Sequence, residues 1–147
     1  MAKEMDVLAR LVRGMQFEVD SSTGHSITLD ASVEDGGQDT GFRPIELLLV
    51  GLAGCTGMDV ISILRKKRQN VTGYEVRVHG VRVDTHPKVF VDITVEHIVT
   101  GHHVQPKAVA RAIELSETRY CPVGAMLNKT ARVTNTFRII DAAQLPM

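Results

Sequence analysis

Two cysteines, Cys55 and Cys121, are the side chains in this 147-residue sequence best suited to chemistry. Two thiols are too few for a disulfide scaffold, so in a reducing compartment they are buried filler, a metal site or a redox centre. Cys55 lies between Gly51 and Gly57, in a glycine-rich segment that would weaken a helix unless another backbone packed closely against it. Cys121 precedes Pro122 at the expected start of a helix, where free N–H groups and the helix dipole favour a thiolate. The cysteines alone leave all three alternatives open.

The spacing of the candidate residues argues against a metal site, and the length of the chain argues against a nucleophile-elbow cysteine. The cysteines are 66 residues apart (121 − 55) and form no Cys-x-x-Cys motif. Zinc is disfavoured, so we assign no metal ligand. Residues 53–57, Ala-Gly-Cys-Thr-Gly, also fit a cysteine variant of the nucleophile elbow, but the parallel sheet of that fold needs more chain than remains. The histidines, none of which form a zinc-binding pair, are His25, His79, His86, His97, His102 and His103.

The elements expected to position the cysteines follow an α+β order in one domain, residues 1–147. Alternating apolar residues predict a β-meander over 6–31, a hairpin over 74–100 and a final strand over 131–140. Apolar segments that begin at proline predict a helix over 44–68 and helices within 106–128. The helix over 44–68 is apolar almost all round, which is typical of a core helix buried on most sides. We expect antiparallel sheets around this long central helix.

The charge balance excludes several classes of partner. Seventeen Lys and Arg residues balance seventeen Asp and Glu residues, so no net field attracts nucleic acid or an anionic membrane. The basic cluster at residues 65–69 is interpreted as a charged helix end. The N-terminus lacks a signal-peptide pattern, and the longest nearly uncharged stretch, Leu47–Met58, is shorter than the roughly 20 residues of a membrane span. We expect a soluble cytoplasmic protein that associates with itself, because a neutral domain has little charge repulsion between copies.

Three motifs together resemble the OsmC/Ohr family of osmotically inducible and organic hydroperoxide resistance proteins. They are the helix start Pro44-Ile-Glu-Leu-Leu48, the small-residue pair Gly54-Cys55, and the segment Cys121-Pro-Val123. The resemblance extends from the N-terminal meander to the final strand. It implies an intertwined α+β homodimer in which two central helices pack together and the active sites lie at the subunit interface. It also implies a thiol peroxidase, and the pattern is closer to the OsmC-like branch.

The resemblance implies a mechanism that uses both sulfurs. Cys55, as a thiolate, would attack an organic hydroperoxide and become a sulfenic acid. Cys121 would condense with the sulfenic acid to form a disulfide before the sulfur oxidises further. An external thiol or dithiol, such as a lipoylated protein, would then reduce the disulfide. This chemistry would serve defence against oxidative stress and needs no metal or bound cofactor.

The sequence departs from the family pattern where the thiolate would be stabilised. Organic hydroperoxide resistance proteins carry a glutamate ten positions before the first cysteine, where this chain has Ile45. Glu46 follows, about 100° further round the helix. The arginine of those proteins is displaced as well: Arg13 lies nearby, Gln16 lies at its expected place, and Arg43 is another donor. Because a thiolate without a cation is costly to bury, these departures favour the alternative of a non-catalytic protein that binds a small hydrophobic ligand at the dimer interface.

Overall fold

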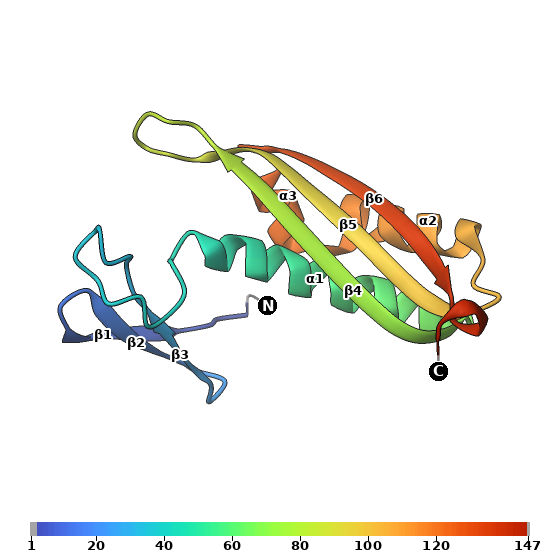
Figure 1. Cartoon of the computed structure of the whole chain (residues 1–147), viewed down its shortest axis with the longest axis horizontal. Coiled ribbons are helices and arrows are strands. Elements are labelled where there is room, and N and C mark those ends of the chain that lie inside the picture. The colour runs from blue at the N-terminus through green and yellow to red at the C-terminus, as the bar shows by residue number, and fades with distance from the viewer. Residues whose placement is uncertain (1–2, 147) are drawn as a thin grey trace. The chain divides into compact units, whose positions relative to one another are not determined.

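The computed structural model describes residues 3–146 as two compact units, one that ends at Leu48 and one that begins at Leu49. The N-terminal unit is a three-stranded antiparallel sheet, drawn in blue in Figure 1. Its strands are β1 (Val7–Arg13), β2 (Gln16–Ser21) and β3 (Ser26–Leu29), which neighbour one another in chain order. The expected meander is therefore present.

A buried carboxylate organises the segment that follows this sheet. Asp30 accepts a hydrogen bond from the Thr40 hydroxyl at 2.6 Å and from the backbone N–H groups of Gln38 and Thr40 at 3.2 Å each. The Thr40 hydroxyl and the backbone amides hold the pKa of Asp30 at about 2, below its ordinary value, although burial acts in the opposite direction. Position 41 must be glycine, because a Cβ there would collide with the carbonyl oxygen of Thr28. These contacts fix the path of the chain toward the long helix.

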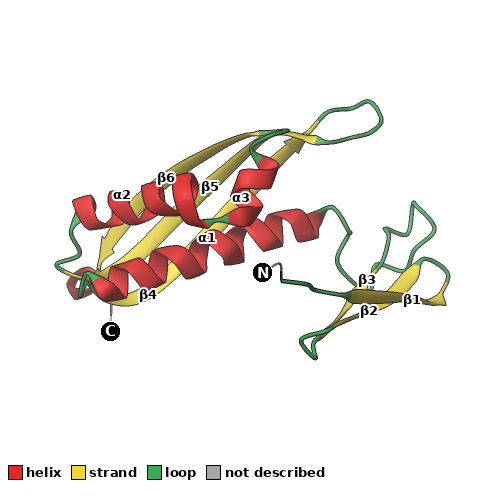
Figure 2. Ribbon diagram, turned by 180° about the vertical axis from the view of Figure 1, so that it is seen from behind, coloured by secondary structure: helices red, strands yellow, loops and turns green. Residues whose placement is uncertain are grey.

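The C-terminal unit places three helices on one face of a three-stranded sheet (Figure 2). The helices are α1 (Glu46–Lys66), whose first turn lies at the end of the N-terminal unit, α2 (Pro106–Leu115) and α3 (Pro122–Leu127). A π-helical turn, η1 (Ser116–Tyr120), joins α2 to α3. The strands β4 (Asn70–Arg82), β5 (Phe90–His102) and β6 (Arg132–Asp141) lie in that order, and a 3-10 turn, η2 (Ala142–Gln144), follows.

The core of this unit lies between α1, β5 and α2. Val60 and Leu64 of α1, Val99 of β5 and Val109 of α2 are fully buried in one cluster. Burial of a valine or leucine side chain is worth about 1.5–3 kcal/mol relative to leaving it in water. This cluster therefore holds both helices against the sheet.

One pairing in the second sheet departs from the expected antiparallel order. β4 and β5 form a long antiparallel hairpin, but β6 runs parallel to β5, from the pair Asp92↔Arg132 to the pair Gly101↔Asp141. The crossover through α2, η1 and α3 returns the chain to the end of the sheet at which β5 begins, and parallel neighbours need such a connection. The second sheet is mixed, because alternation of apolar residues specifies a strand and not its direction.

The helix α1 buries one stripe rather than most of its surface. Its buried residues, Leu52, Thr56, Val60 and Leu64, recur every four positions. The expectation of burial on most sides is wrong for the single chain, since Met58 on another face is 73% exposed. A helix that is apolar all round does not show by its pattern which face meets the sheet.

By length and composition α1 is also apolar enough to cross a membrane, although its buried stripe packs into the core.

Candidate redox site

The first half of the site is built on α1. Cys55 and Asp59 are four residues apart on this helix, so their side chains emerge on the same face. Thr56 lies beside Cys55 and belongs to the buried stripe that faces the core. Cys55 is half-buried and its thiol is free. The helix thus presents a thiol, a hydroxyl and a carboxylate within little more than one turn.

The turn before α3 brings Cys121 to this face of α1. Cys121 caps the N-terminus of α3, and its Sγ accepts a hydrogen bond from the N–H of Gly124 at 3.2 Å. The N–H of Cys121 in turn donates to the carbonyl of Ser116 at 2.9 Å and closes the π-helical turn, a rare element that is frequent at functional sites. As a result, the Sγ atoms of Cys55 and Cys121 and a carboxylate oxygen of Asp59 all lie within 4.8 Å of one another.

A buried hydroxyl holds the carboxylate in place. The Ser116 hydroxyl donates a hydrogen bond to Oδ2 of Asp59 at 2.9 Å and forms a second one, at 2.8 Å, with the Thr56 hydroxyl. Ser116 is fully buried and Thr56 nearly so. Because buried polar groups that are fully hydrogen-bonded favour one arrangement, these contacts orient Asp59 next to the sulfurs.

The environment of Cys121 keeps its thiol protonated. Burial raises the pKa of Cys121 to about 11, and contact with Cys55 and the charge of Asp59 act in the same direction. The N–H of Gly124 opposes this rise without overcoming it. The expected preference for a thiolate at a helix N-terminus is therefore outweighed by burial. Since the thiolate is the reactive form of cysteine, Cys121 is poorly suited to be the first sulfur to react.

A small cavity adjoins Cys121. Its volume is about 50 Å³, and its lining includes Leu52, Thr56, Cys121 and Asn135. A water molecule needs roughly 10–15 Å³ of such space, so the cavity has room for solvent beside the sulfur. It is far smaller than the roughly 300–1,000 Å³ pockets that hold drug-sized ligands.

Asn135 extends the polar lining of this cavity into the sheet. Its Oδ1 accepts a hydrogen bond from Nε2 of His97 at 3.0 Å, and the Tyr74 hydroxyl donates to Nδ1 of His97 at 2.7 Å. Burial lowers the pKa of His97, although the hydrogen bond to Asn135 opposes it, and burial raises the pKa of Tyr74. Both rings are therefore neutral near pH 7, and the network crosses β4, β5 and β6 without a charge.

The other predicted site residues belong to the N-terminal unit. Arg13 is exposed at the end of β1. The Arg43 guanidinium pairs with Asp39 at 2.7 Å, and its pKa is raised by that hydrogen bond. Glu46 accepts a hydrogen bond from the N–H of Arg43 at 2.8 Å and so helps to start α1. Roles for Arg13, Arg43 and Glu46 at a thiolate stay predictions.

Sequence reasoning did not assign four of these residues to the site: Thr56, Asp59, Ser116 and Asn135. Asp59 could have been found, because its spacing of four from Cys55 places both side chains on one helical face. Ser116 carries no comparable signal, since it lies 57 residues (116 − 59) from the carboxylate that it contacts. Only the folded chain brings Ser116 to Asp59.

A family model provides the deciding comparison. The model for OsmC-like protein matches residues 36–136 of this chain. The chain belongs to the OsmC-like family. Protein YhfA of Escherichia coli strain K12 is 36% identical over 138 residues, which cover 94% of this chain and 100% of YhfA. The resemblance inferred from the sequence motifs is confirmed.

Solved structures share the fold over nearly the whole chain. A hypothetical protein from Aquifex aeolicus VF5 is 31% identical with a TM-score of 0.84, covering 95% of this chain and 98% of its own. An OsmC-like protein from Mycoplasma pneumoniae is 21% identical with a TM-score of 0.80, and the match covers 95% of this chain and 99% of that protein. An organic hydroperoxide resistance protein OsmC from Legionella pneumophila is 14% identical with a TM-score of 0.68, covering 93% and 98%. The α+β OsmC-like fold with a long central helix is confirmed, and the last two structures show the fold alone.

Proposed function

We propose that this chain is a cysteine-based peroxidase that reduces organic hydroperoxides in the cytoplasm as a defence against oxidative stress. The observation that carries the proposal is the approach of the Cys55 and Cys121 sulfurs to within 4.8 Å across 66 residues of sequence (121 − 55). Membership of the OsmC-like family, which includes organic hydroperoxide resistance proteins, supports the same chemistry.

In the first step, the Cys55 thiolate attacks the terminal oxygen of the hydroperoxide. An S–O bond forms while the O–O bond breaks, so the sulfur is oxidised by two electrons to a sulfenic acid. The alkoxide leaves and takes up a proton to become the alcohol. Cys55 is assigned this step because it is only half-buried, whereas Cys121 is 5% exposed and its raised pKa keeps it protonated.

In the second step, Cys121 attacks the sulfenic sulfur of Cys55. The S–S bond forms, and the sulfenic hydroxyl leaves as water with the proton of Cys121. A disulfide has an S–S distance of about 2.05 Å, so the sulfurs approach by at most about 2.8 Å (4.8 − 2.0). Rotation of the two short side chains between staggered conformations moves the sulfurs relative to each other. An external thiol or dithiol, such as a lipoylated protein, then returns both cysteines to the thiol form.

The exposed face of α1 supports a homodimer in which two copies of this helix pack together. Val50 and Met58 are 48% and 73% exposed, and a Cβ at Gly54, midway between them, would meet no atom within 4 Å. Val50, the first residue of this stripe, lies two positions before Leu52, the first residue of the buried stripe. Two positions correspond to about 200° around the helix, so the two stripes lie on nearly opposite faces. An apolar stripe with a glycine at its centre lets a second helix approach closely, and such exposed patches mark association sites.

Kinetics of peroxide consumption test the proposed activity. With excess dithiol, the wild-type chain should consume cumene hydroperoxide, and Cys55→Ser should abolish this consumption because no sulfenic acid can form. When no dithiol is added, Cys121→Ser should consume one equivalent to form the sulfenic acid of Cys55, or a few if this sulfur oxidises further, and then stop. Unchanged turnover by Cys55→Ser would sink the proposal.

The size of the protein in solution tests the homodimer. Analytical ultracentrifugation should show a dimer for the wild-type chain and a monomer for Met58→Lys, which places a charge on the exposed stripe of α1. Val81→Lys, at a 47% exposed position of β4, is the matched control and should leave the dimer intact. A wild-type monomer, or equal dissociation of both variants, contradicts this assignment of the interface.

The ligand-binding alternative requires a larger site than the one beside Cys121. That cavity, at about 50 Å³, is smaller by a factor of about six or more than the pockets that enclose drug-sized ligands. Larger open hollows, of about 420 Å³ and 570 Å³, lie along α1, and the lining of both includes Met58 on the exposed stripe of this helix.

A further inference from the structure

We propose that the reduced cluster of Cys55, Cys121 and Asp59 is a binding site for a zinc ion. The three potential ligand atoms come from two separate segments, α1 and the start of α3, and converge within 4.8 Å. This site goes beyond the peroxidase activity and does not depend on it.

The geometry is close to that of a tetrahedral site. With Zn–S bonds of about 2.3 Å and Zn–O bonds of about 2.0 Å, tetrahedral angles place two ligand sulfurs about 3.8 Å apart and a sulfur and an oxygen about 3.5 Å apart. The observed separations, at most 4.8 Å, reach these values if each side chain shifts by about 1 Å or less. No change in either helix is required.

The donor set selects the class of metal. Two thiolates and a carboxylate combine soft and hard ligands, which suits zinc, whereas magnesium and calcium take oxygen ligands and copper(I) prefers sulfur alone. The three groups can together carry three negative charges. Among residues 3–146, Asp59 forms no salt bridge, so a divalent cation at this point would supply the missing positive charge.

The surroundings complete the site. The Ser116 hydroxyl donates to Oδ2 of Asp59 at 2.9 Å, which is the kind of outer contact that orients a ligating carboxylate. The cavity of about 50 Å³ adjoins Cys121, one of the three ligands, and has room for a water molecule. Three protein ligands with one open position is the pattern of zinc sites that take part in reactions. Zinc and a disulfide between the same two sulfurs would exclude each other.

Metal binding by the reduced full-length chain tests the proposal in the absence of any peroxide, so its result is independent of the proposed activity. Zinc ion is titrated in competition with a coloured chelator, and one equivalent should bind. Cobalt(II) in its place should give sulfur-to-metal charge-transfer absorption and the intense visible bands of a tetrahedral site.

Substitutions locate the ion. Ser116→Ala should weaken zinc binding by about 10- to 100-fold through loss of the outer hydrogen bond, and Asp59→Asn and Cys121→Ser should weaken it at least as much. Glu114→Gln, an exposed carboxylate on α2 outside the cluster, is the matched control and should bind as the wild type does. Circular dichroism confirms that each variant is folded. Absence of binding to the wild-type chain, or binding that survives Asp59→Asn and Cys121→Ser and is lost on substitution of His102 and His103, overturns the proposal.

Discussion

Cys121 should remain protonated well above neutral pH, and this separates the roles of the two sulfurs. The variant Cys55→Ser leaves Cys121 as the sole thiol while its burial, the largest cause of the shift, is retained. The pKa of Cys121 is raised to about 11 in the native chain. At pH 8, about one such thiol in a thousand is then ionised, compared with about one in four for an ordinary cysteine of pKa about 8.5. In Cys55→Ser, loss of the contact with Cys55 removes part of this rise, so we expect the pKa of Cys121 to lie between about 8.5 and about 11.

Alkylation by iodoacetamide, followed by mass spectrometry across pH 7–11, measures this pKa. Burial slows alkylation at every pH, so the informative quantity is the pH at which the rate reaches half its maximum rather than the rate itself. We expect this midpoint to lie above about pH 8.5 in the folded variant, and near pH 8.5 when the same variant is unfolded in guanidinium. A midpoint at or below about pH 8.5 in the folded protein would refute the reasoning and make Cys121 a candidate for the first nucleophile.

Two further expectations concern stability. Folding lowers the pKa of His97 below its ordinary value of 6.5, so below about pH 6.5 the unfolded chain binds a proton that the folded chain does not. The free energy of unfolding should therefore fall as the pH drops below about 6.5. The contribution of His97 to this fall is at most about 1.4 kcal/mol per pH unit. Urea unfolding from pH 8 to pH 5 should show a weaker pH dependence for His97→Gln than for the wild type, and identical slopes would contradict the assignment of a buried neutral His97. Leu64→Ala removes a fully buried side chain of the core and should cost about 2–5 kcal/mol in the same assay. Val81→Ala, at an exposed site, should cost no more than about 0.5 kcal/mol; similar losses for the two variants would contradict the placement of the core.

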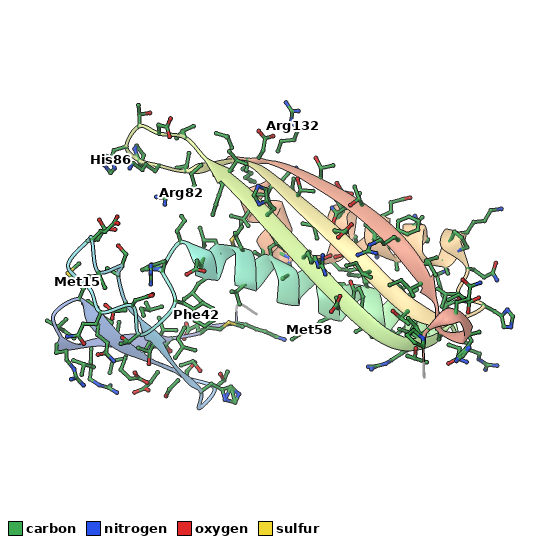
Figure 3. All side chains as sticks on the ribbon, in the orientation of Figure 1. Met15, Phe42, Met58, Arg82, His86 and Arg132 are labelled. Atoms are coloured by element: carbon green, nitrogen blue, oxygen red, sulfur yellow. The ribbon has the colours of Figure 1, made fainter. Side chains whose placement is uncertain are left out.

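The elements of the fold could be predicted from local patterns, because each pattern reflects a local physical cause. Pro44 before an apolar run predicted the helix observed as Glu46–Lys66, and strict alternation predicted the strands Asn70–Arg82 and Phe90–His102. The parallel direction of β6 could not be predicted in this way, because a strand with one buried face has the same alternation in either direction. The exposed stripe of α1 was hidden for a similar reason, since its apolar residues surround the helix (Figure 3, with Met58 labelled).

The candidate site could be predicted only in part. Cys55 and Cys121 were each noticed for their immediate neighbours, but their approach came from a resemblance, because 66 residues (121 − 55) of chain separate them. The effect of burial on Cys121 depends on how α3 packs, and reasoning from the helix N-terminus alone gave the opposite direction for its pKa. Asp59 completes the cluster through ordinary helical spacing, and Ser116 reaches it only through the turn η1.

The most direct test of the central claim is mass spectrometry of the reduced protein after one equivalent of cumene hydroperoxide, with Cys55→Ser and Cys121→Ser treated in parallel. The account predicts rapid loss of two hydrogens from the wild-type chain, with a peptide cross-link between Cys55 and Cys121, and no such loss in either variant. Thiols that stay reduced for minutes in the wild-type chain would contradict a two-cysteine peroxidase.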